Sequence, residues 1–175
     1  CYAKGVDIID RYFPESELYN VPLDAKEQAG IDEAVALARE SDVTIMVLGG
    51  NEKTVREEYS RTSLDLCGRQ EILLQAVHAV GKPVILLMID GRASTINWAE
   101  RYVPGIGHAW FPGEFMGDAI AQVLFGDYNP GGKLAVTFPR SVGQIPFAFP
   151  FKPGSDSKGF VRVTGSLYPF GYGLS

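Results

Sequence analysis

The chain has 175 residues, of which 46% are hydrophobic, which suffices for one globular domain with a buried core. Its 21 Asp and Glu outnumber its 16 Lys and Arg, and this acidic balance argues against nucleic acid as a partner, because phosphate binding needs a basic surface. No apolar run approaches the ~20 residues that cross a bilayer, so we expect no membrane partner either.

The first half of the chain predicts a helix and a strand. Residues 1–24 show no sustained period and are typical of an entry segment on the surface. From Gly30 to about Glu40, apolar residues recur at helical spacing, which predicts an amphipathic helix. The run 43–48 is short, continuous and apolar, which is typical of a strand buried on both faces of a parallel sheet, and Gly49-Gly50 ends it.

Helices and strands continue to alternate along the rest of the chain. Residues 69–80 predict a second helix, and residues 84–89 predict a second buried strand. The later elements are predicted as a short helix over 95–102, a strand over 105–111, a helix over 117–124 and, after a glycine-rich turn, a strand over 134–138. The tail from Pro150 predicts a mobile loop that returns to a docked segment at Tyr168.

This alternation predicts the α/β class, as a three-layer αβα sandwich of the flavodoxin-like kind. Right-handed crossovers would give a mostly parallel sheet with helices on both faces. In such sheets ligands bind beyond the carboxyl ends of the strands. We therefore expect the functional edge to include the loops after Leu48, Ile89 and Phe111.

Cysteines and histidines are few and do not form a ligand pattern. Cys1 and Cys67 lie far apart in the sequence and predict two free thiols. His78 and His108, the only histidines, are too few to suggest a zinc site. We expect no metal and no cofactor.

Four ordered segments resemble the C-terminal sandwich domain of glycoside hydrolase family 3, of the β-glucosidase and β-xylosidase type. They are residues 57–70 (EEYSRTSLDLCGRQ), 81–92, 118–140 (DAIAQVLFGDYNPGGKLAVTFPR) and 168–175 (YPFGYGLS). The resemblance implies that residues 1–175 are a single C-terminal domain. In the family an N-terminal barrel domain that carries the catalytic nucleophile normally precedes this domain, and the chain contains no such barrel.

The loop from Gly49 to Leu66 holds the candidate catalytic residues. Four carboxylates gather there, namely Glu52, Glu57, Glu58 and Asp65, and from charge alone they would be a solvated acidic loop. The resemblance implies that one glutamate of this loop is the general acid/base, placed before an Asp-Arg or Ser-Arg pair. Here that pair is Ser60-Arg61, and counting back from it favours Glu57, with Glu58 and Glu52 as alternatives.

Two further residues are candidates for the substrate site. Arg61 is expected to pair with a nearby carboxylate and fix the loop, because a guanidinium offers a bidentate fork. Trp110 offers an aromatic face that can bind a sugar ring, with core or hinge packing as the alternative. The sequence departs from the family pattern at Gly50 and Phe115, where many relatives carry Glu, and at His108, which replaces a commoner acidic residue.

The resemblance implies a retaining exo-β-glycosidase that releases terminal β-linked glucose or xylose. Its partners would be a β-linked oligosaccharide or glycoside and the barrel domain of the same protein, and the isolated chain would be inactive. The alternative is a non-catalytic carbohydrate-binding or packing module of the same fold. A flavodoxin-like nucleotide or signalling domain is disfavoured, because Gly105-Ile-Gly107 enters a strand and Trp110 stands at the place of the third glycine.

Overall fold

A parallel three-stranded sheet forms the centre of the protein in the computed structural model, which describes residues 1–8, 21–58, 60–147 and 165–174. Its strands follow the order β1-β2-β3, with β1 at Thr44–Gly49, β2 at Val84–Ile89 and β3 at Gly105–His108. The central strand β2 pairs with β1 over its full length, and its bounds agree with the predicted strand. The tail expected to be mobile from Pro150 lies outside the described residues up to 164.

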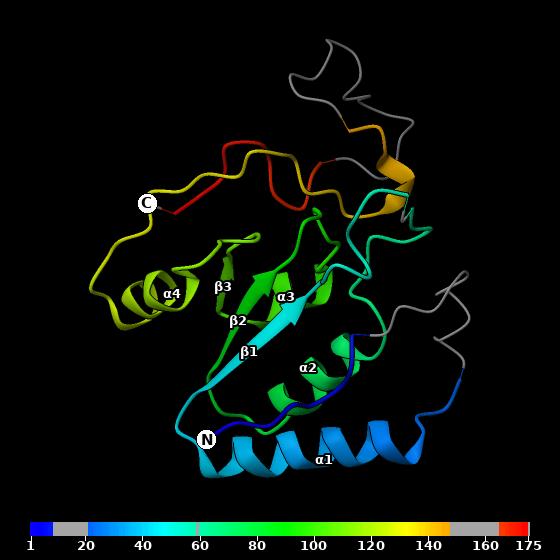
Figure 1. Ribbon diagram of the computed structural model, residues 1–175, viewed down its shortest axis with the longest axis vertical. Helices are drawn as coiled ribbons and strands as arrows, with labels where there is room; N and C mark the ends of the chain where they lie inside the picture. Colours follow the sequence, from blue (N-terminus) through cyan, green and yellow to red (C-terminus); the bar gives the residue numbers. More distant parts are fainter. Residues whose placement is uncertain (9–20, 59, 148–164, 175) are drawn as a thin grey trace.

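Helices separate the strands, so the fold is an α/β sandwich, as predicted. Figure 1 shows α1 and α2 together below β1, and α4 well apart from them. The helices span Ala25–Glu40 (α1), Gln70–His78 (α2), Asn97–Tyr102 (α3) and Met116–Phe125 (α4), followed by the 3-10 turn η2 at Val142–Gln144.

The core lies between β2 and the helices that precede and follow it. Leu86 and Met88 of β2 are fully buried, and Leu74 and Val77 of α2 are 1% exposed. Burying one such side chain stabilises the fold by roughly 1.5–3 kcal/mol. These contacts fix the sheet whose upper edge carries the candidate loops.

The strand β1 is buried on one face only, so the expectation that it is buried on both faces is wrong. Met46 and Leu48 join the core, whereas Ile45 and Val47 are 40% and 55% exposed. Successive side chains of a strand point to opposite faces, and α1 and α2 contribute to the core on the Met46 face. A continuous apolar run therefore does not by itself show that both faces are covered.

The first helix begins at Ala25, five residues before the predicted start at Gly30. The Oδ1 atom of Asp24 accepts a hydrogen bond from the Glu27 amide at 2.7 Å, and the Glu27 carboxylate accepts one from the Asp24 amide at 2.9 Å. This reciprocal pair is a capping box, which satisfies two amides that the first turn leaves without helical partners. The signal Asp-x-x-Glu is present in the sequence and marks the true start.

Two predicted strands differ from the structure, one in its end and one in its existence. The strand β3 stops at His108 instead of Phe111, because Trp110 has a φ of 55° and turns the chain. Residues 134–138 form no regular strand. Phe138 makes an isolated antiparallel bridge with Tyr168, so this segment pairs with the C-terminal segment and not with the central sheet.

Both cysteines are free thiols, as expected, with Cys1 exposed and Cys67 buried. Within the described ranges, no group of three or more His, Cys, Asp or Glu side chains could hold a metal ion. No helix of the described residues has the length and apolar character to cross a membrane.

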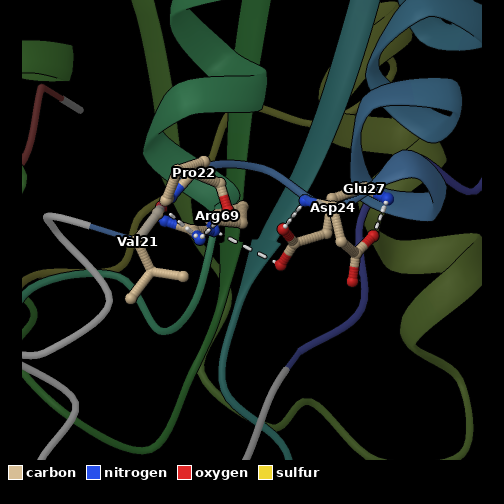
Figure 2. A network of polar contacts seen from close by, with 5 residues as sticks. All are labelled: Val21, Pro22, Asp24, Glu27 and Arg69. Carbon is tan, nitrogen blue, oxygen red and sulfur yellow. Dashed lines mark hydrogen bonds and ion pairs between the residues drawn. The ribbon is translucent and has the colours of Figure 1, made fainter.

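A buried arginine joins the start of α2 to the segment before α1. Figure 2 shows the Arg69 side chain between the carbonyls of Val21 and Pro22, with Glu27 of α1 alongside. Arg69 Nε lies 3.3 Å from a carboxylate oxygen of Glu27, and the two side chains are only 4% and 12% exposed. The guanidinium therefore satisfies a carboxylate and two carbonyls in a region from which water is largely excluded.

Removing this guanidinium should destabilise the domain strongly. We expect Arg69→Met to lower the free energy of unfolding by about 3 kcal/mol, because it leaves the Glu27 carboxylate without its buried partner. Urea unfolding followed by circular dichroism measures the change. The control is Lys26→Met, which removes an exposed ion pair with Asp7 and should leave the midpoint near that of the wild type. Equal midpoints for the two variants would contradict the conclusion that buried Arg69 stabilises the fold.

Candidate active site

The carboxyl ends of the three strands lie at one edge of the sheet. Gly49 at the end of β1 is level with Ile89 at the end of β2, and His108 at the end of β3 is level with Met88. The loops that follow these strands therefore leave the sheet together, as the predicted fold requires. The loop after β1 carries the candidate acid/base.

The side chain of Gln70 holds both ends of this loop. Its amide nitrogen donates to the carbonyls of Gly49 at 2.8 Å and Cys67 at 3.0 Å, and its amide oxygen accepts from the Gly49 amide at 2.8 Å. Gln70 is 1% exposed, so these bonds form away from water, where leaving one unmade is costly. The loop from Gly49 to Cys67 thus has a fixed base.

The beginning of the loop, residues 50–55, packs onto the ends of β1 and β2 and is called its first root. A Cβ atom added to Gly50 would lie 2.5 Å from a methyl group of Val55 and 2.7 Å from Oδ1 of Asp90. A Cβ atom added to Gly91 would lie 2.4 Å from the other methyl group of Val55. Val55 therefore fills the space above two glycines, and the departure from the family pattern at Gly50 has a steric reason in this chain.

The last part of the loop, residues 61–65, is called its second root, and Asp65 holds it in place. Its carboxylate accepts hydrogen bonds from the hydroxyls of Ser63, at 2.7 Å, and of Thr95, which precedes α3. The Thr95 amide also donates to the Leu64 carbonyl at 2.8 Å. Nη2 of Arg61 donates to the Asp65 carbonyl at 2.7 Å, so Arg61 braces the root through a main-chain oxygen, and its contact with substrate stays a prediction.

The three candidate glutamates lie in two parts of the loop. Glu57 and Glu58 are exposed at its tip, and Glu58 has a φ of 66°, in the left-handed region that few residues other than glycine adopt. Glu52 is exposed in the turn at the first root, where the Thr54 hydroxyl accepts from the Asn51 amide at 2.9 Å. Glu57 and Glu58 thus lie at the tip and Glu52 at the first root, and the assignment of the acid/base among the three stays a prediction.

The loop after β2 is organised by a buried carboxylate. Asp90 is 2% exposed and accepts a hydrogen bond from the Ser94 hydroxyl at 2.6 Å and one from the Arg92 amide at 3.2 Å. These bonds close the turn that leads to Thr95. Asp90 therefore shapes the loop against which the acid/base loop rests.

Trp110, the second candidate for sugar binding, is half-buried in an aromatic cluster. Its ring centroid lies 4.2 Å from that of His108 and 6.0 Å from that of Phe138. These contacts agree with packing in the core, the alternative to sugar binding, and the sugar-binding role of Trp110 stays a prediction. Phe111 and Phe115 at the same edge are 52% and 73% exposed.

Sequence reasoning did not single out Gln70, Val55 or Thr95, which hold the loop in place. A glutamine at the start of an amphipathic helix gives no sign that its side chain turns back to the preceding strand. Val55 and Thr95 follow no periodic pattern either. Only the fold brings the ends of β1 and β2 together and so reveals their contacts.

The fold and this edge define an α/β sandwich domain that displays a carboxylate-bearing loop beyond its parallel strands. The family model described as "Glycosyl hydrolase family 3 C-terminal domain" matches residues 4–175. The chain belongs to this family, as the resemblance indicated.

Relatives with this domain are named as glycosidases. A β-xylosidase of Formosa agariphila is 41% identical over 178 residues, which cover 99% of this chain and 22% of the relative. A periplasmic β-glucosidase of Salmonella typhimurium is 42% identical over 190 residues, which cover 99% of this chain and 25% of the relative. The chain thus spans about a quarter or less of the length of these relatives.

Solved structures of β-glucosidases share the fold. The β-glucosidase EmGH1 of Erythrobacter marinus superposes with a TM-score of 0.80 at 43% identity, over 86% of this chain and 21% of the other. The β-glucosidase of Listeria innocua in complex with isofagomine superposes with a TM-score of 0.74 at 28% identity, over 84% of this chain and 22% of the other.

The position of His108 in the aromatic cluster predicts a pH dependence of stability. Burial lowers the pKa of His108 below its usual value, although the nearby Asp90 carboxylate acts in the opposite direction. The unfolded chain protonates this histidine at pH ~6.5, whereas the folded chain resists protonation. The contribution of neutral His108 to the free energy of unfolding is therefore complete above the pKa of this histidine in the unfolded chain. It is lost as the pH falls from that value toward the lower pKa of the folded chain.

We expect His108→Gln to reduce this loss of stability on acidification below pH ~6.5. Urea unfolding at a series of pH values measures it. The wild-type protein, measured over the same pH range, is the reference. An unchanged slope of stability against pH in His108→Gln would show that His108 does not cause it.

Proposed function

We propose that the protein carrying this chain is a retaining, exo-acting β-glycosidase that releases terminal β-linked glucose or xylose, and that Glu57 is its general acid/base. The observation that carries the proposal is the loop from Gly49 to Cys67, which is fixed at its base by Gln70 and presents an exposed carboxylate at the edge of the sheet. The names of the relatives, β-xylosidase and β-glucosidase, support the substrate class.

Retaining hydrolysis needs two carboxyl groups about 5–5.5 Å apart, one as nucleophile and one as acid/base. Glu57 would protonate the oxygen of the leaving group and then activate water to release the sugar. The nucleophile would come from an N-terminal barrel domain of the same protein. That domain is a proposed partner, and it agrees with the greater length of the relatives.

A non-catalytic carbohydrate-binding or packing module is the second candidate. The observation in its favour concerns Phe115 and His108, which stand where many relatives carry acidic residues. Phe115 is 73% exposed, and His108 packs against aromatic rings. Exposed aromatic side chains can bind sugar rings without any chemistry. Kinetics of a Glu57 variant separates the two candidates.

The 175-residue chain alone should not hydrolyse aryl β-glucosides or β-xylosides, because in the proposed mechanism the nucleophile comes from the barrel domain. Release of p-nitrophenol from both substrates by the purified chain is the measurement. Turnover that Glu57→Ala abolishes in the isolated chain would contradict the proposed division of labour between two domains.

In the full-length protein, Glu57→Ala should respond to azide. An activated aryl group leaves without much protonation, so the variant should still form the glycosyl-enzyme but hydrolyse it slowly. Azide needs no general base and should restore kcat, with a β-glycosyl azide as product. Kinetics with a dinitrophenyl glycoside and identification of the product by NMR measure both effects.

The neighbouring glutamates are matched controls for this experiment. Glu58→Ala and Glu52→Ala should show no azide rescue. Rescue of one of these variants instead would move the acid/base to that residue and keep the proposed activity. If none of the three variants is selective for the leaving group and none is rescued by azide, this loop does not carry the acid/base. That outcome would favour the non-catalytic module.

A further inference from the structure

We propose that Asp65 and Thr95 are positioning residues for the acid/base, and that their hydrogen bond holds the second root of the acid/base loop on the loop that follows β2. This inference rests on the proposed function and adds to it two residues that do not touch the substrate. We call the contacts of Asp65 with Ser63 and Thr95 the Asp65 latch.

The latch joins two separate connections at the same edge of the sheet. Asp65 lies in the loop after β1, whereas Thr95 lies between β2 and α3. Each oxygen of the carboxylate accepts from one hydroxyl, Oδ1 from Thr95 and Oδ2 from Ser63. Hydrogen bonds to a charged acceptor are stronger than bonds between neutral groups, so the contact resists opening.

The loop after β2 is a firm support for the latch. Thr95 is 4% exposed and the adjacent Ser94 is 1% exposed. Ser94 is held by the buried Asp90 at 2.6 Å. The Thr95 hydroxyl therefore lies in a buried, hydrogen-bonded connection, and Asp65 is tied to that connection.

The path from the latch to the candidate acid/base is short. Arg61 connects them, because its guanidinium binds the Asp65 carbonyl and its own backbone lies four residues after Glu57. A segment of four residues spans at most about 14 Å, which limits how far Glu57 can lie from the residue that binds the root. Misplacing a catalytic group by about 1 Å can cost about 100-fold in rate.

The first root alone does not set the tip. Val55 packs above Gly50 and Gly91, but Arg56, Glu57 and Glu58 that follow it are exposed. With one root held, a loop can still rotate about that root. Gln70 holds the loop at its far end, Cys67, and the Asp65 latch adds a fixed point nearer to the tip, which the orientation of a carboxylate toward a leaving-group oxygen requires.

The test is a pair of substitutions at Thr95 in the full-length protein. Thr95→Val keeps the shape of the side chain and removes the hydroxyl, while the main-chain bond from residue 95 to Leu64 remains. Thr95→Ser keeps the hydroxyl and removes only a methyl group. Each variant is assayed for kcat/KM on a dinitrophenyl β-glycoside and on the methyl β-glycoside of the same sugar.

We expect Thr95→Val to lower kcat/KM on the methyl glycoside by about 10- to 100-fold and on the dinitrophenyl glycoside by less than about 2-fold, because only the methyl leaving group needs a well-placed acid. Thr95→Ser should stay near wild type on both. Thr137→Val is the matched control, because the buried Thr137 hydroxyl has no hydrogen-bond partner in the part of the chain that the structure describes. It should leave both values unchanged.

Equal losses on the two substrates in Thr95→Val would show a general structural role and overturn the inference, as would unchanged values on both. Glu57→Ala measured beside it keeps the two proposals apart. If Glu57→Ala is selective for the methyl glycoside and Thr95→Val is not, the latch alone is refuted. If Glu57→Ala shows no selectivity, the proposed role of Glu57 fails, and the inference that rests on it is refuted with it.

Discussion

The carboxamide of Gln70 is the interaction on which the functional edge depends. It donates to the carbonyls of Gly49 and Cys67 and accepts from the Gly49 amide, all in a site that is closed to water. One side chain thereby replaces the hydrogen bonds that the end of β1 would otherwise lack. A buried amide with unmade bonds costs free energy, so the two ends of the loop stay together as long as the core stays folded.

Tight packing at the end of β1 gives this constraint its geometry. Gly49 has a φ of 138°, and a Cβ atom there would lie 2.0 Å from the Ile89 carbonyl oxygen. Only glycine permits that approach, which brings the chain across the end of β2 before the loop begins. Val55 and Asp65 then bind the two roots to the connection after β2, and Arg56, Glu57 and Glu58 between them are exposed.

The sequence predicts the elements whose side chains follow a simple period, and it predicts less well where contacts distant in sequence decide. The strand 84–89 agrees with its prediction because a buried central strand is apolar at every position. Residues 134–138 are mostly apolar like a strand, yet Phe138 bridges to Tyr168 instead of joining the sheet, and no local pattern distinguishes these partners. The early start at Ala25 was readable from the capping box at Asp24.

The candidate site divides in the same way. The position of the loop beyond a buried strand follows from the fold class, and the order of Glu57 before Ser60-Arg61 follows from the family resemblance. The residues that hold the loop in place could not be predicted, because their contacts join segments that only the fold brings together, such as Gln70 of α2 with the end of β1. The sequence thus indicates which segment carries the chemistry, whereas the structure indicates what orients it.

The exposed tip has a consequence for how the proposed enzyme would be built. A general acid works in surroundings that favour the protonated carboxyl, which means a site with little water. In this chain the tip is exposed and the roots are held, so the surroundings must come from a surface that covers the tip. On the proposed function that surface belongs to the barrel domain with its nucleophile. The loop held at its roots in one domain and a water-excluding surface of the other would then form the acid site only where the two domains meet. On the proposed function, the substrate also lies there.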